Sequence, residues 1–149
     1  MGTQQLLLIV LGVIIVGIAI AVGITIFNNQ SYNSNQQAVS QELNTYASMV
    51  VQWWKTPVTQ GGAGQDTLAA GDDDAITEWC GFPATGSLST DSGKYLVTSA
   101  TAGGTTVVLT GCGTETRGGL YPEVVTTIEL ATSNITSAIG TDANGNPAD

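Results

Sequence analysis

The chain opens with an unbroken apolar run from Leu6 to Phe27, in which Thr25 carries the only polar side chain. As an α-helix, a run of about 22 residues is roughly 33 Å long, enough to cross a hydrocarbon core of about 30 Å. A cleaved secretory signal fits less well, because no Lys or Arg precedes the run and no small-residue cleavage site follows it. We therefore predict that residues 1–27 form an apolar helix, suited to a membrane or to the core of a filament.

Residues 28–55 are mostly polar but carry one apolar stripe. The segment contains no Pro or Gly before Thr56-Pro57, so the helix is expected to continue through it and to end there. Steps of three and four residues predict an amphipathic helix with one buried face. The residues of this face, which we expect to pack on a sheet, are Val39, Leu43, Tyr46, Val50 and Trp54.

Residues 56–149 are rich in Gly, Ser and Thr and have the pattern of a small β-domain. Runs of β-branched residues bounded by Gly or Pro predict antiparallel strands at 94–100, 105–111 and 123–130. A loop is expected before them, with at most one helical turn at 75–79, and a short strand in the tail after residue 130. The predicted fold class is α+β, a long N-terminal helix packed on a small antiparallel meander.

The alternation within the strands indicates which side chains face the helix. For the first two strands the expected inward residues are apolar, but the third strand leaves two alternatives open. The candidates are Tyr95 and Val97, Val107 and Leu109, and then either Val124 and Ile128 or Val125 and Thr127.

Charge excludes several functions. The net charge is −9, and only Lys55, Lys94 and Arg117 are basic. Nucleic-acid binding needs clustered Lys and Arg, and anionic lipid headgroups attract the same clusters, so neither is an expected partner. The chain has no His, the commonest general base and a frequent metal ligand. We therefore expect neither enzymatic activity nor a cofactor.

Two acidic groups are the remaining candidates for a metal site. The run Asp72–Asp74 is typical of a solvated loop. In the tail, the spacing of Asp142, Asn144, Asn146 and Asp149 is loosely that of a calcium loop but lacks its terminal Glu. No metal site is predicted.

The two cysteines, Cys80 and Cys112, both lie in the polar part of the chain. In a small domain behind a membrane-spanning helix, such a pair predicts a disulfide and an oxidising compartment. Closing a loop of about 33 residues would stabilise the domain by roughly 3–4 kcal/mol on the chain-entropy model. The alternative is two buried free thiols.

Two triplets fit the glycosylation sequon, at Asn29 and at Asn134. Such triplets also arise by chance in a chain rich in Asn, Ser and Thr, so both positions are candidates only.

The segment MGTQQLLLIVLGVIIVGIAIAVGITIF, with the amphipathic helix, the meander and the late cysteine pair behind it, resembles the type IV pilin family. Subunits of that family assemble into extracellular filaments, with the apolar helices in a central bundle and the globular domains outside. The resemblance implies three kinds of partner: copies of the same chain, the inner-membrane pilus assembly machinery and the prepilin peptidase. It also implies insertion in a membrane first and a place in a surface filament afterwards.

The sequence departs from the family pattern at its start. The family's peptidase removes a short basic leader after Gly, and no such leader precedes Met1 here. With Met1 as the first residue, position five is Gln5, where the family usually has a Glu that pairs with the N-terminal amine of a neighbouring subunit. Gln5 can accept a hydrogen bond from an ammonium group but adds no charge, so the attraction would be weaker.

The glycines of the apolar helix indicate how copies could pack, because glycine permits close approach of helices in an apolar setting. Local unwinding of the helix is the alternative role. The residues expected to act in assembly are Met1, Gln5, Leu6, Gly12, Val13, Gly17 and Gly23.

The predicted function is that of a structural subunit of a type IV pilus-like filament for adhesion, motility or cell contact. Two alternatives stay open. One is a single-span membrane protein that displays a small binding domain, and the other is a pseudopilin of a secretion apparatus.

Overall fold

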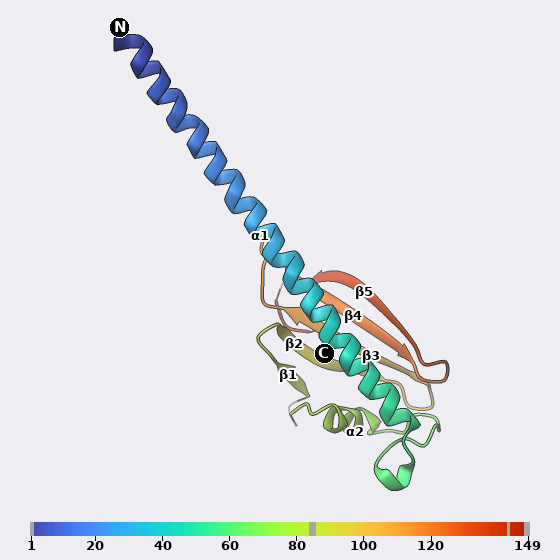
Figure 1. The fold of residues 1–149 in the computed structure, drawn as a ribbon. Coiled ribbons are helices and arrows are strands. Elements are labelled where there is room, and N and C mark those ends of the chain that lie inside the picture. The colour runs from blue at the N-terminus through green and yellow to red at the C-terminus, as the bar shows by residue number, and fades with distance from the viewer. Residues whose placement is uncertain (1, 84–85, 143, 148–149) are drawn as a thin grey trace.

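A computed structural model describes residues 2–83, 86–142 and 144–147, and it consists of one long helix and one small sheet domain (Figure 1). Helix α1 runs without a break through 54 residues, Gly2–Lys55, and is therefore roughly 80 Å long. Its second half packs on an antiparallel sheet, whereas its first half extends away from the domain (Figure 1). The predicted α+β fold is confirmed.

The sheet is a five-stranded meander in which each strand pairs with the next one along the chain. Strand β5 has nine residues, although the sequence predicted only a short strand there. It is long because it pairs with β4 over its whole length, from Asn134 opposite Glu129 to Asp142 opposite Tyr121. The strands are β1 (Ser87–Ser89), β2 (Gly93–Ala100), β3 (Thr106–Gly113), β4 (Tyr121–Glu129) and β5 (Asn134–Asp142).

The connection from α1 to the sheet contains a short 3-10 helix, η1 (Val58–Gln60), and a second α-helix, α2 (Asp72–Trp79). The sequence predicted at most one turn for α2, but the helix has eight residues. Its first residue, Asp72, accepts a hydrogen bond from the backbone N–H of Ala69 at 2.7 Å, and acidic groups are favourable at a helix N-terminus. Ile76, a residue of α2 itself, is fully buried. Its packing in the core supplies the stability that so short a helix lacks alone.

The face of β4 that meets α1 carries Val124 and Ile128, both fully buried. Val124 lies opposite Gly111 of β3, and Ile128 lies opposite Val107. Side chains of directly opposed residues share a face of the sheet. Because positions 107 and 111 of β3 face the helix, Val124 and Ile128 of β4 face it too. Of the two predicted alternatives, the structure has Val124 and Ile128 on the inner face.

The C-terminal end of α1 is closed by the loop that follows it. The backbone N–H groups of Ala63 and Gln65 donate to the carbonyls of Trp53 and Trp54, at 3.2 and 3.0 Å. These bonds satisfy carbonyls that have no partner within the last helical turn. The loop comes so close that a Cβ at Gly62 would overlap the backbone around Trp53 and Thr56, so only glycine fits there.

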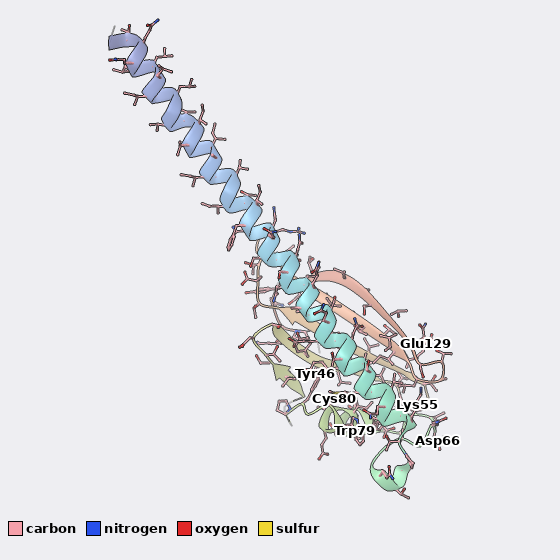
Figure 2. All side chains as sticks on the ribbon, in the orientation of Figure 1. Tyr46, Lys55, Asp66, Trp79, Cys80 and Glu129 are labelled. Carbon is pink, nitrogen blue, oxygen red and sulfur yellow. The ribbon has the colours of Figure 1, made fainter. Side chains whose placement is uncertain are left out.

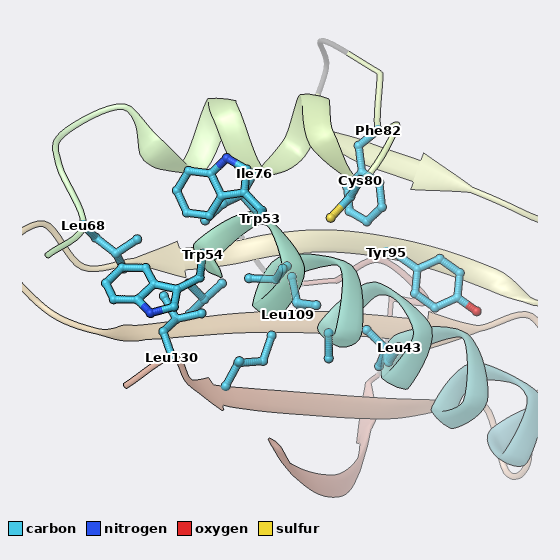
Figure 3. Close-up of a cluster of buried hydrophobic side chains, with 14 of the residues drawn as sticks. Leu43, Trp53, Trp54, Leu68, Ile76, Cys80, Phe82, Tyr95, Leu109 and Leu130 are labelled. Carbon is cyan, nitrogen blue, oxygen red and sulfur yellow. The ribbon is translucent and has the colours of Figure 1, made fainter. Parts of the chain in front are cut away.

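The core lies between α1, α2 and the sheet. Trp53 and Trp54 form its distal end, where they meet Leu68, Ile76 and Leu130 (Figure 3). Trp53 also donates a hydrogen bond from Nε1 to the carbonyl of Gly61 at 3.1 Å, so its polar group is satisfied. This end of the domain is therefore fixed by both apolar burial and hydrogen bonds.

Candidate functional site

The first half of α1 is the largest exposed apolar surface of the described chain. Large apolar side chains from Leu6 to Phe27 are between 48% and 71% exposed, and they surround the helix on all sides (Figure 2). The first buried residue of the helix is Tyr32. Contiguous apolar patches of this extent mark membrane or protein contacts. By length and composition, α1 is the one helix of the described residues that could cross a membrane.

The predicted assembly residues Gln5, Leu6 and Val13 lie on this exposed half, whereas Met1 falls outside the described residues. At Gly12, Gly17 and Gly23, an added Cβ would meet nothing within 4 Å. The fold of a single chain therefore does not require glycine at these three positions. Glycine costs about 1 kcal/mol relative to alanine in a helix, and in an apolar setting it permits close approach of another helix.

The polar group within the apolar half is already satisfied. Thr25 donates its hydroxyl to the carbonyl of Ala21 at 3.0 Å, one turn earlier. Since this bond stays within the helix, the surface from Leu6 to Phe27 offers a partner only apolar contact. Either lipid chains or other apolar side chains can cover it.

Asn35 joins α1 to the domain at the point where the helix leaves it. Its Nδ2 donates to the carbonyl of Ser92 at 2.8 Å, and its Oδ1 accepts from the backbone N–H groups of Thr114 and Glu115, at 3.0 and 3.3 Å. A side chain at Gly113 would overlap Oδ1 of Asn35. One amide on the helix thus holds the two loops at this end of the sheet.

A second contact at the same end places Arg117 over the ring of Tyr32, with Cζ at 4.5 Å from the ring centroid. Tyr32 is only 2% exposed. Such a cation–π contact stabilises by about 0.5–1 kcal/mol at exposed sites and by more when desolvated. The loop that follows β3 therefore lies against α1 (Figure 1).

Sequence reasoning missed Asn35, Tyr32 and Arg117. The two helix residues lie in a polar stretch with no apolar period, and the hydrogen-bond partners of Asn35 are 57 to 80 residues away along the chain. The absence of Pro and Gly in the stretch signals only that the helix continues. Nothing local in the sequence marks the amide as a clamp.

The predicted sheet-packing residues Val39, Leu43 and Val50 are fully buried, and Trp54 is 5% exposed. Tyr46 is half-buried and stacks edge-on against Phe82, with ring centroids 5.1 Å apart. Four of the five side chains therefore lie inside the core, and Tyr46 packs against its edge.

Tyr46 also meets Tyr95 on β2, with ring centroids 5.4 Å apart. Burial raises the pKa of the Tyr95 phenol, and the neighbouring Glu42 carboxylate raises it further. Glu42 in turn accepts a hydrogen bond from the hydroxyl of Thr90 at 3.1 Å. These contacts tie the middle of α1 to the edge of the sheet that carries β1.

The predicted disulfide between Cys80 and Cys112 is wrong, because both residues are buried free thiols. Cys80 packs in the core on the helix side of the sheet (Figure 3). Cys112 points to the opposite side, because its neighbour Gly111 faces Tyr95 and Leu43 and successive residues of a strand alternate between faces. The sheet itself therefore separates the two sulfur atoms.

Burial raises the pKa of the Cys80 thiol to about 11 and that of Cys112 to about 12. For Cys112, the carboxylates of Asp142 and Glu123 add to the increase, and Lys94 opposes it. Both thiols are protonated at neutral pH, and a protonated thiol is a poor nucleophile.

The acidic tail folds on itself. Asp142 accepts hydrogen bonds through Oδ2 from the backbone N–H groups of Asn144 and Asn146, at 3.0 and 3.1 Å. Asn146 accepts from Nζ of Lys94 at 3.4 Å, while Asp149 lies outside the described residues. Among residues 2–83, 86–142 and 144–147, no three His, Cys, Asp or Glu side chains are close enough to hold a metal ion.

The two sequon asparagines differ in their surroundings. Asn29 is half-buried on α1, close to the end of the apolar half, and Asn134 is exposed at the start of β5. Glycosylation at either position stays a prediction.

Compared with models of known protein families, with curated proteins and with solved structures, the chain shows no match. The function is therefore inferred from the geometry of this chain.

Proposed function

We propose that the chain is a structural subunit of an extracellular type IV pilus-like filament. The observation that carries the proposal is the exposed apolar half of α1, attached without a break to a half that packs on a folded domain. A helix that only anchors a domain needs to match the bilayer and nothing more. The three glycines whose Cβ positions are empty favour a surface that copies of the helix approach closely.

The subunit is inserted in a membrane before assembly. A helix that moves from lipid into a bundle of like helices exchanges one apolar environment for another, so its exposed side chains never meet water. Van der Waals packing between helices then drives assembly, as it does for helices within a bilayer. The inner-membrane pilus machinery and the prepilin peptidase are the partners that this route requires.

The domain forms the outer surface of the filament. Its described surface is rich in Ser, Thr and Asn and in carboxylates, with few basic groups. A net charge of −9 keeps such a surface soluble and limits association between filaments. Adhesion, motility and cell contact are the roles that this filament would serve.

Two substitutions in the apolar half test the proposal with purified full-length chain from which detergent is removed. Gly17→Trp places a bulky ring where helices approach, and Val13→Asp places a carboxylate in the apolar bundle, at a cost of about 2.5–3.5 kcal/mol on the membrane insertion scale. Both variants are expected to form no filaments in electron micrographs. Circular dichroism of the detergent-solubilised variants should show the parent's fold.

Val58→Asp is the matched control, because Val58 is 70% exposed in the loop beyond the far end of α1. It is expected to assemble like the parent. A parent chain that stays a lipid-solvated monomer at every concentration would refute the filament and support the single-span anchor. Filaments of normal length from Gly17→Trp and Val13→Asp would also refute the proposal.

A further inference from the structure

The second half of α1 has an exposed face directly opposite the sheet. Eleven residues make about three helical turns, so positions that differ by eleven lie on one line along the helix. Gln30, Gln41 and Gln52 form such a line and are all exposed. The buried residue Val50 lies half a turn around the axis from Gln41, on the side of the sheet. We call the exposed surface from Gln30 to Gln52 the amide face.

The amide face continues a line that begins in the apolar half. Gly12 and Gly23 lie eleven residues apart, and two further steps of eleven reach Ser34 and Thr45 beside Gln41. All four residues are small and exposed. A line of small, exposed residues thus runs along α1 from its exposed apolar half onto the domain.

Charge is excluded from the amide face. Between Gly2 and Trp54 the helix has one charged residue, Glu42, although the chain has 12 acidic residues in total. Glu42 lies about 100° around the axis from Gln41, and it accepts a hydrogen bond from Thr90 on the domain. The first basic residue, Lys55, ends the helix beyond the face.

Two hydroxyl groups of the face are satisfied within the helix. Thr45 donates to the carbonyl of Gln41 at 3.0 Å, and Ser48 donates to the carbonyl of Asn44 at 2.8 Å. The side-chain amides of Gln30, Gln41 and Gln52 have no hydrogen-bond partner among the described residues. Each amide offers both donors and an acceptor, so amides on two copies of this face can bond each other.

We propose that the amide face packs against α1 of neighbouring copies, as a continuation of the contact made by the apolar half. This inference rests on the proposed filament and names a further part of its subunit interface. Each copy carries a net charge of −9, so copies repel one another wherever carboxylates meet. On the amide face, helices can approach to about 8–10 Å without bringing like charges together. The hydrocarbon chains of lipid cannot hydrogen-bond with amides, and a basic partner would bind the acidic surfaces instead.

The test is an isosteric change that adds only charge. Gln41→Glu in the full-length chain puts one carboxylate per subunit on the amide face, and Gln60→Glu makes the same change at an exposed position of η1. In about 0.01 M salt, where charges act over about 30 Å, Gln41→Glu should raise the protein concentration needed for assembly about tenfold or more. In about 1 M salt, where screening acts within about 3 Å, the difference should largely disappear. Gln60→Glu should assemble like the parent at both salt concentrations.

A third variant distinguishes the effect of a charge on the amide face from the effect of the total charge of the chain. Gln41→Lys changes the net charge from −9 to −8, yet it also places like charges on the amide face. It should impair assembly in low salt as Gln41→Glu does. Normal assembly of both Gln41 variants beside a parent that forms filaments would overturn this inference alone. Equal impairment of Gln60→Glu would also overturn it, whereas a monomeric parent would refute the filament proposal and this inference together.

Discussion

Asn35→Ala is the sharpest perturbation of the connection between α1 and the domain. The substitution removes three hydrogen bonds: the one that Asn35 donates to Ser92 and the two that it accepts from Thr114 and Glu115. It leaves the apolar core untouched, because the side chain lies at the end of the sheet where the apolar half of α1 leaves the domain. The variant therefore isolates the clamp from the rest of the packing.

The expected loss follows from the surroundings of each bond. The contact with Ser92 is partly buried, whereas those with Thr114 and Glu115 are exposed, so water can replace the latter two at low cost. With about 0.5–1.5 kcal/mol for each bond and the lower values for the exposed pair, the gross loss is about 1.5–2.5 kcal/mol. Alanine is the better helix former by about 0.5–0.7 kcal/mol. The net decrease in the free energy of unfolding is about 1–2 kcal/mol.

Urea unfolding of the detergent-solubilised chain measures this loss through the fluorescence of the buried Trp53 and Trp54. For m of about 2 kcal/mol/M, the midpoint should fall by roughly 0.5–1 M. Ser34→Ala is the control, because the neighbouring Ser34 is exposed and makes no hydrogen bond within the described part of the chain. A midpoint of Asn35→Ala equal to that of Ser34→Ala would refute the clamp.

Two further predictions concern the core and the thiols. Leu43→Ala should lower the free energy of unfolding by about 2–5 kcal/mol, because Leu43 is fully buried, whereas Gln41→Ala should stay within about 0.5 kcal/mol in the same urea titration. Similar effects of the two substitutions would contradict the assignment of the helix faces. Because burial raises the pKa of Cys80 and Cys112 to about 11 and 12, the unfolded chain loses these protons first, at about pH 8.5. Stability should therefore be complete below about pH 8.5 and fall as the pH rises from there to about 12, and the stability of a Cys80→Ala, Cys112→Ala double variant should fall less steeply. Reductant should leave the midpoint at pH 7 unchanged, and a decrease would indicate a disulfide.

Several elements were predictable because their signal is local. The apolar run defines the exposed half of α1, and the 3- and 4-residue steps from Val39 through Leu43 and Tyr46 to Val50 define the half that packs on the sheet. Runs of β-branched residues define β2, β3 and β4 to within a few residues. Helix α2 and the length of β5 were underestimated, because their stability comes from burial of Ile76 and from pairing with β4.

The cysteine pair and the clamp show where local signals end. The spacing along the chain gives the length of the loop that a disulfide between Cys80 and Cys112 would close. It does not reveal that the sheet lies between the two thiols. The side chain of Asn35 is an ordinary polar group until the loops at Ser92 and Thr114 come within hydrogen-bond distance of it. Both outcomes depend on strand register, which pairs residues far apart in sequence.

By itself, the sequence determined that this chain has a long helix with only Glu42 and Lys55 charged, apolar at one end and striped at the other, followed by a small meander. Those properties follow from side-chain polarity and from the fixed periods of helices and strands. Only the tertiary structure decided that Val124 and Ile128 face the helix, that the two thiols lie apart, and that the amide of Asn35 meets the sheet loops while those of Gln30, Gln41 and Gln52 are exposed. These outcomes depend on which face of each strand meets which face of α1, and that choice minimises exposed apolar area over the whole domain at once.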